Sequence, residues 1–140
     1  MDDALAADLR QAVGELVRAV RTVDTMPPGH AAILGYLDRS GPLTTTDLAQ
    51  RRKVTHQSAA KSVKELLALG LISAHPHPED RRKLLLHLAD AGRTRLHAER
   101  SQRADSLEAA IRDSLDPDEQ QHLRTCVELL TRLTRRLSEG

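Results

Sequence analysis

Residues 43–92 read LTTTDLAQRRKVTHQSAAKSVKELLALGLISAHPHPEDRRKLLLHLADAG, a segment that contains two helical patterns, two apolar strand patterns and a cluster of cations. The first helix is expected over residues 43–49. Its start is a capping box, because the Thr44 hydroxyl can accept the Asp47 backbone N–H while the Asp47 carboxylate reaches back. The polar residues 50–53 are expected to form the turn that separates it from the second helix.

The second helix is expected from Thr55, which can cap it, to Leu69, before Gly70 ends it in a left-handed conformation. Apolar residues at spacings of three and four are expected to pack inward: Ala59, Val63, Leu66, Leu67 and Leu71. The other face carries small or hydrogen-bonding groups: Thr55, His56, Gln57, Ser58, Lys61, Ser62 and Lys64. Such groups can reach base edges or phosphates from the major groove. A polar helix face is more often simply solvated, so this face alone does not indicate DNA binding.

A basic hairpin follows, with strands expected over residues 71–75 and 83–88 and a turn rich in proline and acidic residues between them. The tip carries Asp80, Arg81, Arg82 and Lys83. An arginine at the tip suits the minor groove, where negative potential is concentrated, and a neighbouring carboxylate can hold the guanidinium in place. Directly after a helix-turn-helix pattern, this hairpin favours binding to double-stranded DNA.

These residues resemble the winged helix-turn-helix of MarR-type (multiple antibiotic resistance regulator) transcription factors. The resemblance lies in four motifs: Leu43-x-x-x-Asp47-Leu48-Ala49, Val54-Thr55 to Leu66-x-x-x-Gly70-Leu71-Ile72, Asp80-Arg81-Arg82, and Leu86-x-Leu88-x-x-x-Gly92. Amphipathic helices before and after the winged part extend the resemblance over nearly the whole chain. It implies a homodimer, more often a repressor, that binds a pseudo-palindromic operator.

The resemblance also implies roles for particular residues. Arg82 would be the wing-tip arginine with Asp80 as its partner, and Lys61 stands where many relatives carry an arginine. The start of the first helix is included among the expected DNA contacts, with Thr44, Thr45 and Thr46. The chain departs from the family pattern at Ala74, which replaces a frequent arginine, and at Ala89, which replaces the usual threonine cap and whose role Asp90 could fill. A small-molecule effector, if the protein has one, would act between the dimer helices and the winged domain.

Composition favours one compact cytoplasmic domain without membrane association. The 140 residues contain no apolar run of the length a membrane helix needs, no leader pattern, and a single cysteine, Cys126, which fits a reducing compartment. The net charge is only +1, but residues 44–95 hold ten Lys/Arg against five Asp/Glu, while the remainder has eleven against fifteen. A basic segment of +5 beside a remainder of −4 can orient a protein on a polyanion.

The terminal segments predict dimerisation. Apolar residues recur at helical spacing in the first and last segments: Leu5, Leu9, Val13, Leu16, Leu123, Val127, Leu130 and Leu137. Further helices are expected over residues 28–38 and 90–114. The predicted fold is mainly α with a small β-hairpin wing. Its winged helix-turn-helix domain covers residues 28–92 and its helical dimerisation region residues 1–27 and 93–140, in one intertwined unit.

Other classes of protein receive less support. No phosphate loop, nucleophile elbow or paired metal motif indicates an enzyme, and no cofactor is expected. His75 and His77 near the hairpin acids leave a metal-responsive regulator open, and Cys126 leaves an oxidant-responsive one open, although its apolar stripe predicts a buried, inert thiol. His30, His97 and His122 are expected at the surface or its boundary. A helical interaction protein that does not bind DNA is a further alternative.

Overall fold

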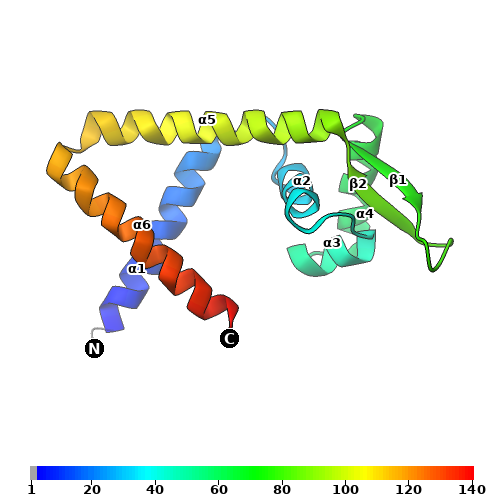
Figure 1. Cartoon of the computed structure of the whole chain (residues 1–140), viewed down its shortest axis with the longest axis horizontal. Helices are drawn as coiled ribbons and strands as arrows, with labels where there is room; N and C mark the ends of the chain where they lie inside the picture. The colour runs from blue at the N-terminus through cyan, green and yellow to red at the C-terminus, as the bar shows by residue number, and fades with distance from the viewer. Residues whose placement is uncertain (1–2) are drawn as a thin grey trace. The chain divides into compact units, whose positions relative to one another are not determined.

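The computed structural model describes residues 3–140, and the chain falls into two compact units, residues 1–103 and 104–140. The elements in chain order are α1 (Asp3–Val20), the short 3-10 helix η1 (Arg21–Val23), α2 (Pro28–Ser40), α3 (Thr45–Arg52), α4 (His56–Ala68), β1 (Ile72–Pro76), β2 (Leu84–Leu88), α5 (Asp90–Ser114) and α6 (Pro117–Ser138) (Figure 1). The predicted fold class, helical with one β-hairpin, is therefore confirmed. None of the helices within residues 3–140 combines the length and apolar character needed to cross a membrane.

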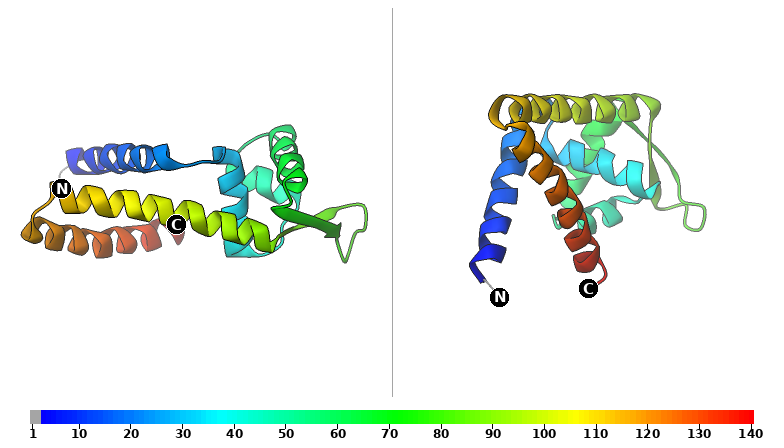
Figure 2. Two further views of the ribbon diagram at one scale, coloured as in Figure 1. Left: turned by 90° about the horizontal axis from the view of Figure 1, so that it is seen from above. Right: turned by 60° about the vertical axis from the view of Figure 1, so that its left-hand side comes forward.

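The core of the first unit lies between α2, α3, α4 and the hairpin, which cluster together in both views of Figure 2. The largest fully buried side chains come from all four parts: Ile33, Leu34, Leu48, Leu66 and Leu86. Full burial of such a side chain contributes roughly 1.5–3 kcal/mol. The core is aliphatic because the chain has one tyrosine and no phenylalanine or tryptophan.

The two strands form an antiparallel hairpin whose register pairs Ile72 with Leu88 and Ala74 with Leu86. Leu86 points into the core, and its backbone also bonds to Leu43, with N–O distances of 2.8 and 3.2 Å. The chain before α3 thus adds a one-residue bridge to the hairpin. The wing is therefore held to the helix-turn-helix in two ways. Backbone hydrogen bonds join Leu86 to Leu43, and the Leu86 side chain packs in the core.

The first turn of α5 packs directly on the backbone that leaves α4. The carbonyl oxygen of Leu71 accepts the Ala89 N–H at 3.1 Å. A Cβ added to Gly92 would lie 2.0 Å from that same oxygen and 2.8 Å from Leu88 Cδ1. Only glycine allows α5 to approach this closely.

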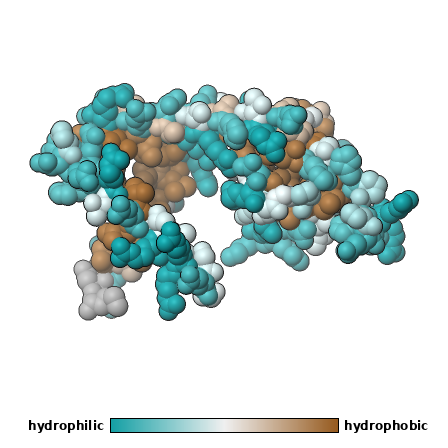
Figure 3. Space-filling view, in the orientation of Figure 1, coloured by the Kyte–Doolittle hydropathy of each residue, from teal (hydrophilic) through white to brown (hydrophobic). Residues whose placement is uncertain are grey.

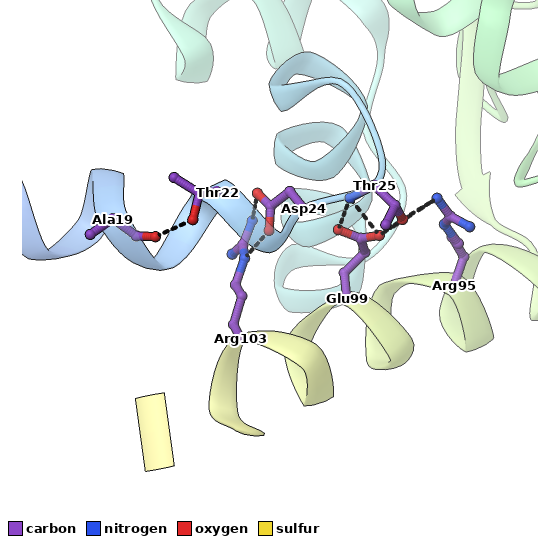
Figure 4. A network of polar contacts seen from close by, with 7 residues as sticks. All are labelled: Ala19, Thr22, Asp24, Thr25, Arg95, Glu99 and Arg103. Carbon is purple, nitrogen blue, oxygen red and sulfur yellow. Dashed lines mark hydrogen bonds and ion pairs between the residues drawn. The ribbon is translucent and has the colours of Figure 1, made fainter. Parts of the chain in front are cut away.

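A polar network ties the connection between α1 and α2 to α5 (Figure 4). Arg103 donates two hydrogen bonds to the Asp24 carboxylate, at 2.6 and 2.7 Å, and this pairing lowers the pKa of Asp24. Glu99, which is only 3% exposed, accepts the Thr25 N–H at 3.1 Å and the Thr25 hydroxyl. Arg95 donates to the Thr25 hydroxyl at 2.7 Å and completes the network. A buried carboxylate is therefore held by several partners, as its desolvation requires.

The second unit contains the end of α5 and the whole of α6. Asp116 caps α6 through a capping box with Glu119, and Pro117 occupies its first turn. No residue of α6 is buried, and Cys126 is exposed. The prediction of a buried thiol is thus wrong for the single chain, because nothing within this unit covers the apolar stripe on which Cys126 lies.

Several local predictions need correction. Residues 50–52, expected as a turn, are the last turn of α3, and the break falls instead at Lys53. Leu67 is exposed although an inward position was expected, since the core contacts of α4 end with Leu66. His30 is buried at 6% exposure, where its Nε2 lies 3.7 Å from Glu65 Oε2. The predicted strands start one residue earlier than the observed ones.

Candidate nucleic-acid interface

The helix-turn-helix begins with the predicted capping box. The Thr44 hydroxyl accepts the Asp47 N–H at 3.1 Å, and the Asp47 carboxylate accepts the Thr44 N–H at 3.0 Å, which lowers the pKa of Asp47. Thr44 and Thr45 are half-buried, whereas Thr46 is exposed. Of the three predicted threonine contacts, Thr46 is therefore the most accessible to a ligand, while Thr44 has a structural role in the cap.

The turn between α3 and α4 depends on one left-handed residue. Lys53 has φ 57°, and its N–H bonds to the carbonyls of Ala49 and Gln50. The Val54 N–H follows with a bond to Ala49 at 3.1 Å, after which the Thr55 hydroxyl accepts the Ser58 N–H at 3.0 Å and starts α4. This short connection holds α3 and α4 at a fixed crossing, as a helix-turn-helix requires.

The helix α4 exposes the polar face that the sequence predicted. Ala59, Val63 and Leu66 are buried on the core side. On the other side, six residues are exposed, namely Thr55, His56, Gln57, Ser58, Lys61 and Lys64, and Ser62 is half-buried. The helix ends in a Schellman arrangement, in which Gly70 has φ 73° and the Leu71 N–H bonds to the Leu66 carbonyl.

The wing tip presents its cations to solvent. Arg81, Arg82 and Lys83 are exposed, and the tip is hydrophilic at the right-hand end of the surface view (Figure 3). Asp80 Oδ1 accepts both the Arg82 backbone N–H at 3.1 Å and its Nε–H at 3.2 Å, so these bonds lower the pKa of Asp80. The Arg82 side chain is nonetheless 92% exposed. Its guanidinium is oriented by Asp80 and still available to a ligand.

Two of the three hairpin histidines are in contact with each other. The His75 and His87 rings meet edge to face, with their centroids 4.9 Å apart. His77 Nδ1 instead accepts the Glu79 N–H at 3.1 Å. Across residues 3–140, no group of three or more His, Cys, Asp or Glu side chains is arranged to hold a metal ion.

The sequence did not predict the contacts made by the two arginines that end α3, because they were expected in the turn after it. Arg51 donates to Ser40 Oγ at 2.6 Å, and its carbonyl accepts the Tyr36 hydroxyl. The guanidinium of Arg52 lies beside Gly29, where a Cβ would be 2.9 Å from Arg52 Nη2 and 3.1 Å from Ser62 Oγ. The signal was Gly29 itself, since a glycine inside a helix often marks the close approach of another group.

The fold and the exposed surface define a DNA-binding protein of the winged helix-turn-helix class. Residues 24–83 match the model of the MarR family. A Pseudomonas aeruginosa protein assigned as a transcriptional regulator is 31% identical, with 94% of each chain covered and a TM-score of 0.83. The chain belongs to the MarR family of transcriptional regulators, a family of regulators rather than enzymes.

Two further comparisons agree. An uncharacterised HTH-type transcriptional regulator of Mycobacterium leprae is 29% identical over 135 residues, with 94% of each chain covered. A variant of S. aureus MepR, solved bound to an oligodeoxyribonucleotide, has a TM-score of 0.66 and 19% identity, and the match covers 92% of this chain and 97% of that one. This last similarity concerns the fold alone.

Proposed function

We propose that the protein is a homodimeric repressor that binds a pseudo-palindromic operator. Each α4 enters a major groove, and each Arg82 enters the adjacent minor groove. The observation that carries this proposal is the exposed polar face of α4 next to a wing whose arginine is oriented by Asp80 but free to bind. A variant of MepR, which shares this fold, has been solved bound to an oligodeoxyribonucleotide, and this supports DNA as the ligand.

The terminal helices support the dimer. Neither α1 nor α6 has a buried residue, although both have apolar stripes. The predicted dimerisation residues are uncovered, except that Leu9 is half-buried: Leu5, Val13, Leu16, Leu123, Val127, Leu130 and Leu137 are all exposed. Brown, apolar surface is visible on these helices in Figure 3. We assign these faces, within residues 1–27 and 93–140, to contact with a second copy, since uncovered apolar faces mark interaction sites.

A dimer would determine the spacing of the two half-sites in the DNA. Two recognition helices about 34–36 Å apart would meet successive major grooves on one face of the duplex. Selection of bound sequences from random duplexes tests the proposal, and the expected result is a palindrome with that half-site spacing. No enrichment in repeated rounds would leave a helical interaction module as the better description.

Replacing Arg82 with alanine is expected to weaken operator binding by about 1–3 kcal/mol, because a groove contact is lost. Fluorescence anisotropy at fixed salt measures the change. Arg112→Ala, at an exposed arginine far along the chain from the wing, serves as the control. Equal affinity of Arg82→Ala and the parent protein would remove Arg82 from the interface.

Replacing Lys64 with alanine is expected to reduce the dependence of binding on salt. If the Lys64 ammonium contacts a phosphate, its loss lowers the slope of log affinity against log salt by about one unit. The reduction should be similar on operator and unrelated DNA, because phosphates carry no sequence information. A titration series from low to high salt checks this, and an unchanged slope would place Lys64 in solvent.

A further inference from the structure

Lys53, in the turn between α3 and α4, has a backbone conformation that lysine rarely adopts. Its φ is 57° and its ψ is 44°, in the left-handed region where the backbone crowds a Cβ atom. Within residues 3–140 it is the one residue other than glycine with positive φ, and the remaining positions of this kind are Gly41 and Gly70. Glycine is the usual residue at such a helix end. The chain therefore keeps a side chain where glycine would be less strained.

The side chain of Lys53 has no role within the fold that accounts for this strain. The residue is exposed, and its ammonium has no hydrogen bond or ion pair among the residues that the structure describes. Its backbone N–H closes the end of α3 on the carbonyls of Ala49 and Gln50, but glycine would supply the same bonds. The side chain is therefore available to a partner molecule.

The two cations that precede Lys53 are engaged by the protein itself. Arg51 donates to Ser40 Oγ at 2.6 Å, and its charge also attracts the Asp47 carboxylate. The half-buried Arg52 lies against Gly29 of α2. Of these three consecutive cations, Lys53 is the one that is exposed and has no partner within the described part of the chain.

The start of α4 determines where Lys53 would lie on a duplex. Thr55 caps α4, and its Cα lies within about 7 Å of the Lys53 Cα because only two residue steps separate them. A helix with its side chains is about 10–12 Å wide and the major groove about 12 Å, so a helix inserted there fills the groove. The chain that leads into the helix must then pass the edge of the groove, which the phosphates form.

We propose that Lys53 contacts the DNA phosphate backbone at the edge of the major groove, where its left-handed conformation holds it. This inference rests on the proposed function and adds to it a cation outside the recognition helix and the wing. The ammonium would displace about one counterion from the duplex. Because phosphates carry no sequence information, Lys53 would help to position α4 in the groove rather than to select bases.

Lys53→Gly separates this role from a structural one, because the expected effects on folding and on binding have opposite signs. Glycine relieves the left-handed backbone, so the melting temperature at fixed protomer concentration should equal that of the parent or exceed it. Binding to a duplex of random sequence should nonetheless weaken, and the slope of log affinity against log salt should fall by about one unit. From about 50 to 200 mM salt, the parent's advantage in affinity should shrink about threefold.

Three further variants identify the group responsible. Lys53→Asn introduces a neutral side chain that tolerates the left-handed region, so it should match Lys53→Gly in binding. Lys53→Arg keeps the charge and should keep the parent's slope. Arg112→Gln removes one positive charge at an exposed position far along the chain and should leave the slope unchanged.

The inference is overturned if Lys53→Gly and Lys53→Asn keep the parent's slope, if Arg112→Gln lowers it as much, or if both Lys53 variants lower the melting temperature. In each of these cases, binding of the parent protein to DNA with its own salt dependence would leave the proposed function intact. A parent protein that does not bind duplex DNA would instead contradict the proposed function, and this inference with it.

Discussion

Leu130→Glu is expected to yield a monomer at concentrations where we expect the parent protein to form the proposed dimer, and operator affinity is expected to fall by a factor of about 100 or more. Leu130 lies on the uncovered apolar stripe of α6. In a dimer contact its replacement would bury a carboxylate from each chain without a partner, at several kcal/mol in total. Because two linked half-sites bind roughly 10²–10⁴ times more tightly than one, loss of the dimer removes most of the affinity.

Sedimentation equilibrium and anisotropy on the same samples measure both effects. Gln121→Glu introduces the same charge at another exposed position of α6 and should leave the dimer intact. A dimeric Leu130→Glu protein would move the contact away from this face of α6. A monomeric variant with full affinity would contradict the proposal that two copies bind one operator.

Gly92→Ala is expected to lower the free energy of unfolding by about 3 kcal/mol, at the upper end of the usual cost of overpacking. The added methyl would have to stand 2.0 Å from the Leu71 carbonyl oxygen, which belongs to backbone and cannot rotate away. Relief would require the first turn of α5 to move off the hairpin. Urea denaturation at fixed protomer concentration measures the change, since concentration affects the stability of a dimer.

Gly14→Ala is the matched control, because it makes the same substitution within a helix where the nearest atoms belong to the flexible end of Arg18. There the ordinary helix preference for alanine should raise stability by about 0.5–1 kcal/mol. Equal effects at the two positions would show that helix propensity, rather than the approach to Leu71, determines the result. Loss of expression of Gly92→Ala alone, with Gly14→Ala well expressed, would agree with the expected destabilisation.

The sequence was most informative where a local signal controls a local structure. The hydroxyls of Thr44 and Thr55 predicted helix starts that the structure shows, and Gly70 predicted a left-handed helix end. Binary patterning located the inward face of α4 because burial repeats with the helical period. The same patterning wrongly placed Leu67 in the core. It cannot show where the core ends, because this depends on which elements pack against the last turn of α4.

Long-range contacts were not predictable from one sequence. Nothing near Asp24 indicates Arg103 as its partner 79 residues away, and nothing near His30 indicates its burial beside Glu65. The end of α3 was missed because Lys53 adopts a left-handed conformation that few non-glycine residues adopt. The DNA-contact roles of the α4 and wing residues remain predictions, because they depend on a partner molecule.

The peptide of Leu71 has a mechanical consequence. Its N–H closes the end of α4 and its carbonyl receives Ala89 at the end of the hairpin, while Gly92 presses the start of α5 against it. Three elements therefore share one rigid joint, in which the recognition helix and the wing cannot be displaced independently. In the proposed dimer, a motion of the start of α5 would therefore move α4 and the wing of one copy together, so that the spacing between the two half-sites would change while the spacing within each stays constant.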